Sequence, residues 1–234
     1  MANKNKSYLK FDHDAYAKTR APDDFWGQVR RTVHGVPVSD DQIKMIVDAI
    51  QSALVMKPDD TLLDIACGNG ALAHLFFDAC AEYLGVDLSE HLISVARKNF
   101  EALPRYQFKQ QGAVEYVCLE RQPERFTKVL CYGSFQYFPA ADAARVLRIL
   151  FDKFCNVQIV FIGNLPDKDR AADFYKTNQP SAVELADCYS QIGIWRTKSE
   201  FARLAGEAGW KVTFSFMPNE FYASYYRYDA MLSR

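Results

Sequence analysis

Two spacings of apolar residues alternate along the chain. Short runs without helical spacing, which indicate strands of a parallel sheet, occupy residues 61–66, 81–86, 106–110, 126–132 and 157–162. Around them, the helical spacing of apolar residues predicts helices over residues 39–56, 71–78, 140–154, 168–176 and 197–209. This alternation predicts one α/β domain built on a doubly wound sheet.

Polar residues at the expected helix starts support these helices. Ser39-x-x-Gln42 and Thr197-x-x-Glu200 both have the capping-box pattern. Pro22, followed by two aspartates, predicts the first turn of another short helix. The residues after it divide into an apolar and a polar face, with Phe25, Trp26 and Val29 against Gln28, Arg30 and Arg31.

Aromatic residues crowd the last part of the chain. Residues 204–216 lead from a helix into a sixth strand. The segment from Glu220 to Met231 follows, with Phe221, Tyr222, Tyr225, Tyr226 and Tyr228. Because aromatic side chains favour strands, we expect this segment to form a final strand.

The stretch from residue 61 to residue 89 carries the candidate chemistry. Its first strand ends near Asp64, and Gly68 and Gly70 then let the backbone turn tightly and let a ligand approach the main chain. A helix and a second strand follow, and that strand ends at Asp87. Ligands of open α/β sheets lie beyond the carboxyl ends of the strands, where an acid is able to accept hydrogen bonds from ribose hydroxyls. The order therefore predicts a cofactor that contains a nucleoside.

Two cofactor classes use this layout. Gly68-x-Gly70-x-x-Ala73 satisfies the dinucleotide fingerprint, and Asp87 lies at the right distance from it. In that fingerprint the first glycine directly follows the strand, whereas here three residues separate Asp64 from Gly68. An acid near the turn also repels a pyrophosphate, and it attracts a cationic sulfonium or ammonium group.

The run Asp64-Ile65-Ala66-Cys67-Gly68-Asn69-Gly70 resembles the D-x-G-x-G-x-G signature of class I S-adenosylmethionine (SAM) methyltransferases, with Ala66 in place of the first glycine. The resemblance continues in element order from about residue 39 to residue 229. It implies an α/β fold with one seven-stranded sheet of order 3-2-1-4-5-7-6, the last strand antiparallel, and helices on both faces. It also implies SAM as cofactor and S-adenosylhomocysteine (SAH) as product.

The resemblance further implies how SAM is held. The methionine part lies at the glycine turn, and the ribose lies on Asp87. Many members have an acid after the third strand that reaches the adenine, but here Gly112 replaces it, so we expect backbone groups or Gln111 to hold the adenine. The expected cofactor-binding residues are Asp64, Ala66, Gly68, Asn69, Gly70, Asp87, Leu88, Gln111, Gly112, Ala113 and Cys131.

Two segments lie outside the seven-strand pattern. We divide the chain into a tail and lid helix at residues 1–38 and a methyltransferase domain at residues 39–234, with an insertion at about residues 178–196. Many small-molecule methyltransferases have an N-terminal segment that closes over both ligands, and aromatic residues commonly line substrate clefts. We therefore expect residues 11–35 to form a lid and the insertion to form the opposite wall. The expected substrate-binding residues are Trp26, Arg30, Arg31, Tyr137 and Trp195, the arginines being suited to an anionic group.

Methyl transfer from a sulfonium needs alignment and exclusion of water more than covalent help. An oxygen acceptor also needs a base, for which His34 and His13 are candidates. Tyr16, Gln136 and Tyr137 are candidates for orienting the acceptor, and each also has a purely structural interpretation.

The segment after the fourth strand bears on the acceptor. Amino methyltransferases of DNA and of glutamine carry Asn/Asp-Pro-Pro-Tyr there, whereas this chain has Cys131-Tyr132-Gly133-Ser134. The aromatic tail and the expected lid are similar to those of methyltransferases acting on sugars and secondary metabolites. We expect methyl transfer to an oxygen or nitrogen of such a small molecule.

Composition narrows the possible partners. The 234 residues are 49% hydrophobic and 24% charged, which predicts an ordinary globular core. A net charge of −1 without a basic stripe indicates no nucleic-acid partner. Without a membrane-length apolar run or a signal peptide, we expect a cytoplasmic protein with no membrane partner. Six scattered cysteines and four ungrouped histidines predict neither a disulfide frame nor a metal site.

Two alternatives remain at this point. A nicotinamide-dependent oxidoreductase is permitted by the glycine spacing, although no second cofactor-binding half and no Tyr-x-x-x-Lys dyad support it. The second alternative is a non-catalytic SAM-binding protein of the same fold. The sequence does not distinguish it from an enzyme, because binding and turnover use the same residues. The sequence leaves the acceptor, its methylated atom and the oligomeric state open.

Overall fold

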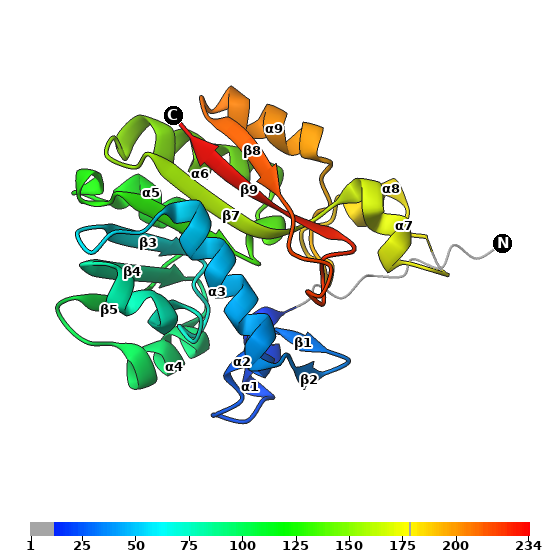
Figure 1. The fold of residues 1–234 in the computed structure, drawn as a ribbon, viewed down its shortest axis with the longest axis horizontal. Coiled ribbons are helices and arrows are strands. Elements are labelled where there is room, and N and C mark those ends of the chain that lie inside the picture. The colour runs from blue at the N-terminus through cyan, green and yellow to red at the C-terminus, as the bar shows by residue number, and fades with distance from the viewer. Residues whose placement is uncertain (1–11, 178) are drawn as a thin grey trace.

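The computed structural model describes residues 12–177 and 179–234, and a seven-stranded sheet forms its centre (Figure 1). The strands are β3 (Thr61–Ile65), β4 (Glu82–Asp87), β5 (Tyr106–Gln110), β6 (Lys128–Tyr132), β7 (Ile159–Pro166), β8 (Lys211–Ser215) and β9 (Arg227–Ser233). They lie in the order β5-β4-β3-β6-β7-β9-β8, and only β9 runs antiparallel to its neighbours. The predicted order 3-2-1-4-5-7-6 and the fold class are confirmed.

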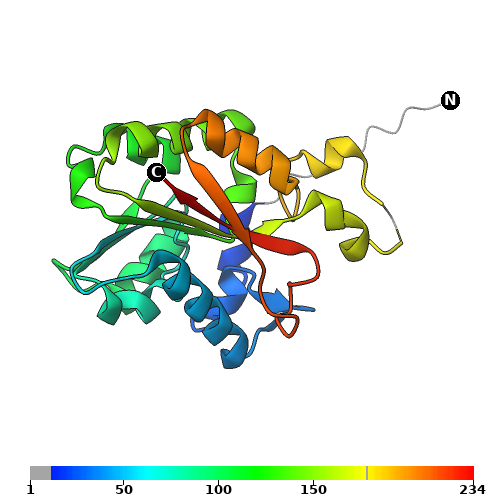
Figure 2. The same cartoon turned by 45° about the horizontal axis from the view of Figure 1, so that its top comes forward.

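Helices cover both faces of the sheet. One layer contains α3 (Asp40–Leu54), the 3-10 helix η1 (Ala73–Ala79) and α4 (Glu90–Phe100). The other contains α5 (Ala113–Leu119), α6 (Ala140–Lys153) and α9 (Lys198–Glu207). Figure 2 shows the sheet between α9 in orange and α3 in blue. In β6, Leu130 and Tyr132 face the α3 layer, whereas Val129 and Cys131 face the α6 layer. The sheet is therefore buried on both faces, as its apolar runs predict.

Two further segments flank the carboxyl ends of the strands. The first contains α1 (His13–Lys18), α2 (Phe25–Gln28) and the hairpin of β1 (Thr32–Val33) and β2 (Val36–Pro37). The second follows β7 and contains η4 (Lys168–Arg170), α7 (Ala171–Phe174) and α8 (Ala182–Leu185), which project from one end of the molecule (Figure 1). Short 3-10 turns η2 (Pro123–Arg125) and η3 (Phe135–Tyr137) bracket β6. The lid and wall roles of the two segments stay predictions, and Phe11 lies outside the described residues.

One of the two predicted capping boxes forms. Thr197 Oγ1 accepts from the backbone N–H of Glu200 at 3.0 Å, and Glu200 Oε2 accepts from the N–H of Thr197 at 2.8 Å. Ser39 occupies the N-cap position of α3, but its side chain makes no cap bond, so this capping box was wrongly predicted. The Gln42 side chain instead donates to the Glu220 carbonyl at 3.1 Å and accepts from the Tyr222 N–H at 2.8 Å. A tertiary contact to the loop before β9 has replaced the local one.

The short helix after Pro22 also differs from expectation. It begins at Phe25 and is capped by Asp24, whose Oδ1 accepts from the Gly27 N–H at 2.8 Å. Gln28 was expected on the polar face but is 2% exposed, and its Nε2 donates to carbonyls of the preceding turn. The helix is therefore anchored by a polar side chain that faces inward.

The aromatic tail is only partly a strand. Turns and bends occupy the chain from Asn219 to Tyr226, and β9 begins at Arg227, so the prediction of a strand from Glu220 was wrong. The chain must reverse direction after β8 before it pairs with β7, and its aromatic side chains pack into the α3 layer from that loop. Within residues 12–177 and 179–234, no helix combines the length and the apolar character needed to cross a membrane. The cytoplasmic location stays a prediction.

Candidate functional site

The turn after β3 alternates left-handed residues with ordinary ones. Ala66, Gly68 and Gly70 have φ angles of 59°, 64° and 76°. The N–H of Cys67, between the first two, donates to the Val86 carbonyl at 3.1 Å and holds the turn against β4. Ala66 thus adopts the conformation that glycine adopts without steric cost, so the turn keeps its shape despite the departure from the glycine signature.

Asp87, at the end of β4, closes the turn from the other side. Its Oδ2 accepts from the Gly68 N–H at 2.8 Å, and its Oδ1 accepts from the Ser89 N–H at 2.8 Å. Burial raises the pKa of the Asp87 carboxyl. Each carboxylate oxygen has a second lone pair, so this residue is still able to accept from ligand hydroxyls. The structure brings together the three residues on which the cofactor prediction depends most: Asp64, Gly68 and Asp87.

Asp64 lies behind the turn rather than at its surface. It is 4% exposed, and its Oδ2 accepts from the Tyr83 hydroxyl at 2.9 Å. Burial raises the pKa of the Asp64 carboxyl to about 7. The carboxyl therefore ionises near neutral pH, and the charge of a ligand bound at the turn would change its ionisation.

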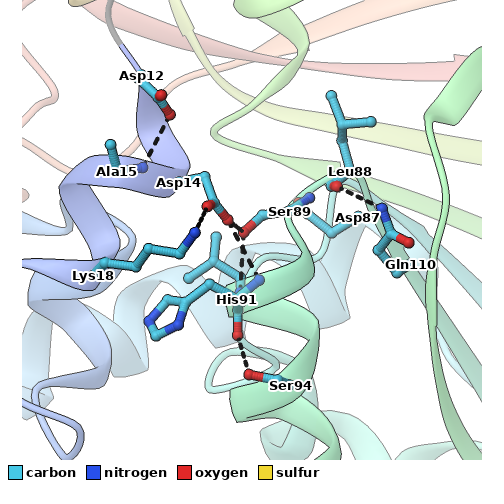
Figure 3. Close-up of polar contacts among 11 residues, drawn as sticks. Asp12, Asp14, Ala15, Lys18, Asp87, Leu88, Ser89, His91, Ser94 and Gln110 are labelled. Atoms are coloured by element: carbon cyan, nitrogen blue, oxygen red, sulfur yellow. Dashed lines mark hydrogen bonds and ion pairs between the residues drawn. The ribbon is translucent and has the colours of Figure 1, made fainter.

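The turns after β4 and β5 lie side by side. Gln110 Nε2 donates to the Leu88 carbonyl at 3.1 Å (Figure 3), and a Cβ on Gly112 would lie 3.8 Å from Leu88 Cδ1. The Leu88 side chain is 73% exposed, an unusual position for a leucine. Gln111 Oε1 is buried and has no hydrogen-bond partner among the described residues. Ala113 begins α5 directly after these residues.

Helix α2 lies on the glycine turn. Asn69 Nδ2 donates to the Phe25 carbonyl at 2.8 Å and to Gln28 Oε1 at 3.0 Å. A Cβ on Gly68 would lie 3.0 Å from Val29 Cγ1. Sequence reasoning missed the role of Gln28, because a glutamine beside two arginines resembles any solvated helix face.

Helix α1 reaches the start of α4, beside Asp87 (Figure 3). The Asp14 carboxylate accepts from the Ser89 hydroxyl and from the His91 N–H, and it pairs with Lys18 at 2.5 Å. Hydrogen bonds from Lys18 and Ser89 lower the pKa of Asp14. Ser89 in turn caps α4. A further carboxylate therefore lies next to the expected ribose site, and no signal in the sequence identified it.

The first segment also meets the insertion. Arg30 donates to the Gln191 carbonyl at 2.9 Å, and the Tyr137 hydroxyl donates to the same oxygen at 3.0 Å. The His13 ring lies 4.3 Å from the Tyr137 ring, and the Arg30 guanidinium carbon lies 5.7 Å from the Tyr16 ring. Four sequence-predicted residues, Arg30, Tyr137, His13 and Tyr16, therefore adjoin one another.

The two candidate bases occupy different surroundings. His34 lies at the exposed turn of the β1–β2 hairpin with a φ of 49°. His13 lies against Tyr137, and burial and the nearby Arg30 lower the pKa of its imidazole to about 4. Of the two histidines, the structure brings His13 to this group, and its ring is neutral at pH 7.

Gln136 and Cys131 are both buried near the end of β6. Gln136 is 1% exposed, its Nε2 donates to the Gly133 carbonyl at 2.8 Å, and its Oε1 has no partner among the described residues. Cys131 belongs to the hydrophobic core on the α6 side. Each cysteine of the chain is a free thiol, and no described group of three or more histidine, cysteine or acidic residues is arranged to hold a metal.

The two tryptophans expected to bind substrate are core or rim residues. Trp195 is 2% exposed within an aromatic cluster, so the premise that it lies outside the core was wrong. Trp26 lines a groove of about 570 Å³ between α2, α3 and η1, together with Ile43 and Val47. Arg31 links Trp26 to Tyr132, since its guanidinium carbon lies 5.4 Å from the Trp26 ring and 5.5 Å from the Tyr132 ring. Contact of either tryptophan with a ligand stays a prediction.

Comparison with known proteins adds independent findings. Residues 62–153 match the family described as "Methyltransferase domain". Ribosomal RNA small subunit methyltransferase A from Geobacter metallireducens is 33% identical over 60 residues, 26% of this chain and 22% of that protein. The same enzyme from Pseudomonas syringae pv. syringae is 31% identical over 71 residues, 30% of this chain and 26% of that protein. The match thus spans about a quarter of the length of these curated relatives.

Solved structures share the fold at low identity. Magnesium protoporphyrin IX methyltransferase from Synechocystis PCC 6803 with bound SAH has a TM-score of 0.64 and 16% identity, covering 90% of this chain and 93% of that one. The DhpI-SAM-HEP complex has a TM-score of 0.65 and 13% identity, covering 95% of this chain and 94% of that one. The cyclopropane synthase MmaA2 from Mycobacterium tuberculosis has a TM-score of 0.62 and 13% identity, covering 92% and 99%.

The methyltransferase domain matched over residues 62–153 and the order of the sheet both agree with the resemblance to class I SAM-dependent methyltransferases seen in the sequence. The matched segment contains both the glycine turn and Asp87. SAM is the cofactor of this class, and structural neighbours hold SAM or SAH.

Proposed function

We propose that the protein transfers a methyl group from SAM to an oxygen or nitrogen of a small molecule. The observation that supports this most is the contact of one N-terminal segment with both halves of the site. Gln28 binds Asn69 in the glycine turn, and Arg30 binds Gln191 in the insertion. These contacts favour a small acceptor, since a folded polymer needs an open surface.

The described residues fit the proposed cofactor. Asp87 would accept from the ribose hydroxyls, and Asp64 lies where a carboxylate favours a cationic ligand. Leu88 and Gly112 would border the adenine, and the unpartnered Gln111 Oε1 is an acceptor suited to its amino group. When bound, SAM supplies a methyl group already activated by its sulfonium.

On the acceptor side we assign the role of general base to His13. Its imidazole is neutral at pH 7 and can accept the proton that a hydroxyl loses as its oxygen is methylated, and it lies against Tyr137, 4.3 Å between ring centroids. Tyr137 and Gln136 would orient the acceptor. Closure of the N-terminal segment would exclude water from this region.

The chain's charge weighs against an RNA acceptor, although two curated relatives are named for ribosomal RNA. A net charge of −1 offers little attraction to a phosphate backbone. The nicotinamide and the non-catalytic alternatives remain outcomes of the test below.

The test is transfer of a labelled methyl group from SAM to separate acceptor panels. One panel holds small phenols, carboxylic acids, amines and sugars, and the other holds folded and single-stranded RNA. We expect label in a small molecule, with loss of turnover in His13→Ala and retention of SAH binding. Label only in RNA would contradict the small-molecule proposal, and tight NAD binding without SAH binding would contradict the cofactor. SAH binding without transfer to any panel would support a non-catalytic role.

A further inference from the structure

Arg227 is a buried cation that makes no ion pair with a described carboxylate, although the buried Asp229, two residues along β9, acts on it at longer range. It is the first residue of β9 and is 9% exposed. Its Nη1 donates to the Asn164 carbonyl, and its guanidinium carbon lies 4.7 Å from the Tyr226 ring centroid. Among the described residues no carboxylate lies within 4.0 Å of it. Burying an unpaired charge is costly, so this position needs an explanation beyond packing.

Arg31 brings a second guanidinium to the same region from the N-terminal segment. It lies between the rings of Trp26 and Tyr132, and within the described chain it too has no carboxylate in ion-pair range. Burial and the charge of Asp229 raise the pKa of the Tyr132 hydroxyl, and the charges of Arg31 and Arg227 oppose that increase. The same two arginines act on Tyr222. Two cations that have no described carboxylate within 4.0 Å therefore act on the same pair of tyrosines.

Three buried polar atoms in the neighbouring turns have no hydrogen-bond partner in the described part of the chain. They are the Tyr132 hydroxyl, Gln136 Oε1 and Asn164 Oδ1. The turns that carry them touch, because Gln136 Nε2 bonds the Gly133 carbonyl and a Cβ on Gly133 would lie 3.5 Å from Asn164 Nδ2. Asn164 is held at a left-handed φ of 65°, and its N–H donates to Asp229 Oδ1 at 2.6 Å. Buried polar atoms are normally paired, so a group of three indicates a missing ligand.

We propose that these five residues, Arg31, Tyr132, Gln136, Asn164 and Arg227, bind the methyl acceptor, and that the acceptor carries an oxyanion such as a carboxylate or a phosphoryl group. The oxyanion lies between the two guanidinium groups, which bind such groups through paired N–H donors. Gln136 Oε1 and Asn164 Oδ1 accept from a hydroxyl or amino group of the same molecule. The inference rests on the proposed function and specifies its substrate class.

Position in the fold supports an acceptor site over a purely structural cluster. The five residues lie at the carboxyl ends of β6 and β7, at the start of β9 and on the N-terminal segment. The glycine turn lies at the carboxyl end of the adjacent strand, β3, which pairs with β6. A molecule bound here lies beside the cofactor, across the strand end from Asp87.

The methionine carboxylate of SAM is a competing oxyanion, so the experiment uses the full chain saturated with SAH, which carries the same carboxylate. Phenyl phosphate, benzoate and uncharged benzyl alcohol are titrated separately into the SAH complex by calorimetry. The phenyl group suits the aromatic surroundings. We expect one of the two anions to bind at least ~10-fold more tightly than benzyl alcohol, and the better anion identifies the carboxylate or the phosphoryl class.

Variants assign the binding to the cluster. Arg227→Met should weaken the better anion by about 10–100-fold, the range expected for lost charged hydrogen bonds, without weakening SAH. Arg145→Met, on the exposed face of α6, is the matched control and should change neither affinity. If Arg227→Met does not fold, Arg31→Met and Tyr132→Phe serve the same purpose.

The outcomes separate the inference from the proposed function. Equal binding of the three probes, binding of none of them, or an anion affinity unchanged by these variants overturns the oxyanion site. So does an Arg227→Met variant that loses SAH instead, which would assign this arginine to the cofactor. Failure of the unaltered chain to bind SAH contradicts the proposed function itself.

Discussion

The side-chain amide of Asn69, in the glycine turn, donates to Oε1 of Gln28, in α2, at 3.0 Å. Both residues are buried, at 1% and 2% exposure. Asn69 Nδ2 also bonds the Phe25 carbonyl, and its Oδ1 accepts from the Ala71 N–H at 3.2 Å. One side chain thus holds the turn in shape and attaches the N-terminal segment to it.

Gln28→Ala should weaken that attachment by one of its two hydrogen bonds and spare the turn, because the bonds of Asn69 to Phe25 and Ala71 remain. Loss of a buried hydrogen bond costs about 1 kcal/mol, so we expect SAH to dissociate roughly fivefold faster. Stopped-flow release of SAH measures this rate. Gln158→Ala, at an exposed position, is the control. An unchanged release rate would show that the N-terminal segment does not retain the cofactor.

Asp87→Asn should weaken SAH binding by about 10–100-fold, since the carboxylate loses its charge toward the ribose hydroxyls. One amide nitrogen would also face the N–H of Gly68 or of Ser89, so some stability is lost as well. Titration calorimetry gives the affinity and thermal unfolding gives the stability. Asp78→Asn, at an exposed position on η1, should alter neither. Normal SAH affinity in the Asp87 variant would remove this residue from the cofactor site.

Substitutions at the two glycines of the turn should have different effects. A Cβ on Gly70 would lie 2.8 Å from the Phe108 ring at a φ of 76°, so Gly70→Ala should destabilise the fold by about 1–3 kcal/mol. A side chain on Gly68 meets Val29 instead, so Gly68→Val should displace α2 and abolish SAH binding in a folded protein. Denaturant unfolding and calorimetry together separate the two effects.

Gly206→Ala is the matched control for the glycine pair. Its Cβ meets nothing within 4 Å in α9, and the helix favours alanine, so stability should rise by about 0.4–1 kcal/mol. Gly68→Val that binds SAH normally would show that the turn does not hold the cofactor.

Binding of SAM should release protons near neutral pH. Burial raises the pKa of Asp64 to about 7 in the free protein, so the carboxyl is largely protonated at pH 6. A cationic ligand favours the carboxylate, so the proton leaves on binding and affinity should rise from about pH 6 to pH 8. Calorimetry in two buffers of different ionisation enthalpy counts the protons. Asp64→Asn should abolish the release, and SAH, which lacks the sulfonium charge, should release less.

The same shift predicts how stability depends on pH without ligand. The folded state keeps the Asp64 proton up to about pH 7, whereas the unfolded chain loses it near pH 4. The folded state therefore binds more protons in that window, and this residue's contribution to stability decreases as the pH rises through it. Asp64→Asn should flatten this part of the unfolding profile, and an unaltered profile would show that Asp64 ionises normally.

The sheet order and the positions of Asp64, Gly68 and Asp87 were predictable because strand, turn, helix and acid follow one another within 27 residues of sequence. Local patterning specifies such a unit, and the seven-strand order followed from its resemblance to known methyltransferases. The Thr197–Glu200 capping box was predictable for the same reason, since both partners lie within one helical turn.

Residues that act over long sequence separations were not predictable. Gln42 leaves its expected cap for the loop before β9, 178 and 180 residues away. Gln28 meets Asn69 across 41 residues, and Asp14 meets Ser89 across 75. Arg227 lies at a strand start, and only the fold places it near Arg31. Local sequence carries no signal for any of these pairs.

Residues 12–38 touch the glycine turn through Gln28, the ribose side through Asp14, and the Tyr132 ring through Arg31. This continuous stretch contacts the surroundings of both expected ligands, so we expect both ligands to leave past it. Steady-state kinetics should therefore be sequential, and departure of SAH and of the methylated product should share one slow opening step. Viscosity and burst measurements on the intact chain would report a common step after transfer rather than two independent releases.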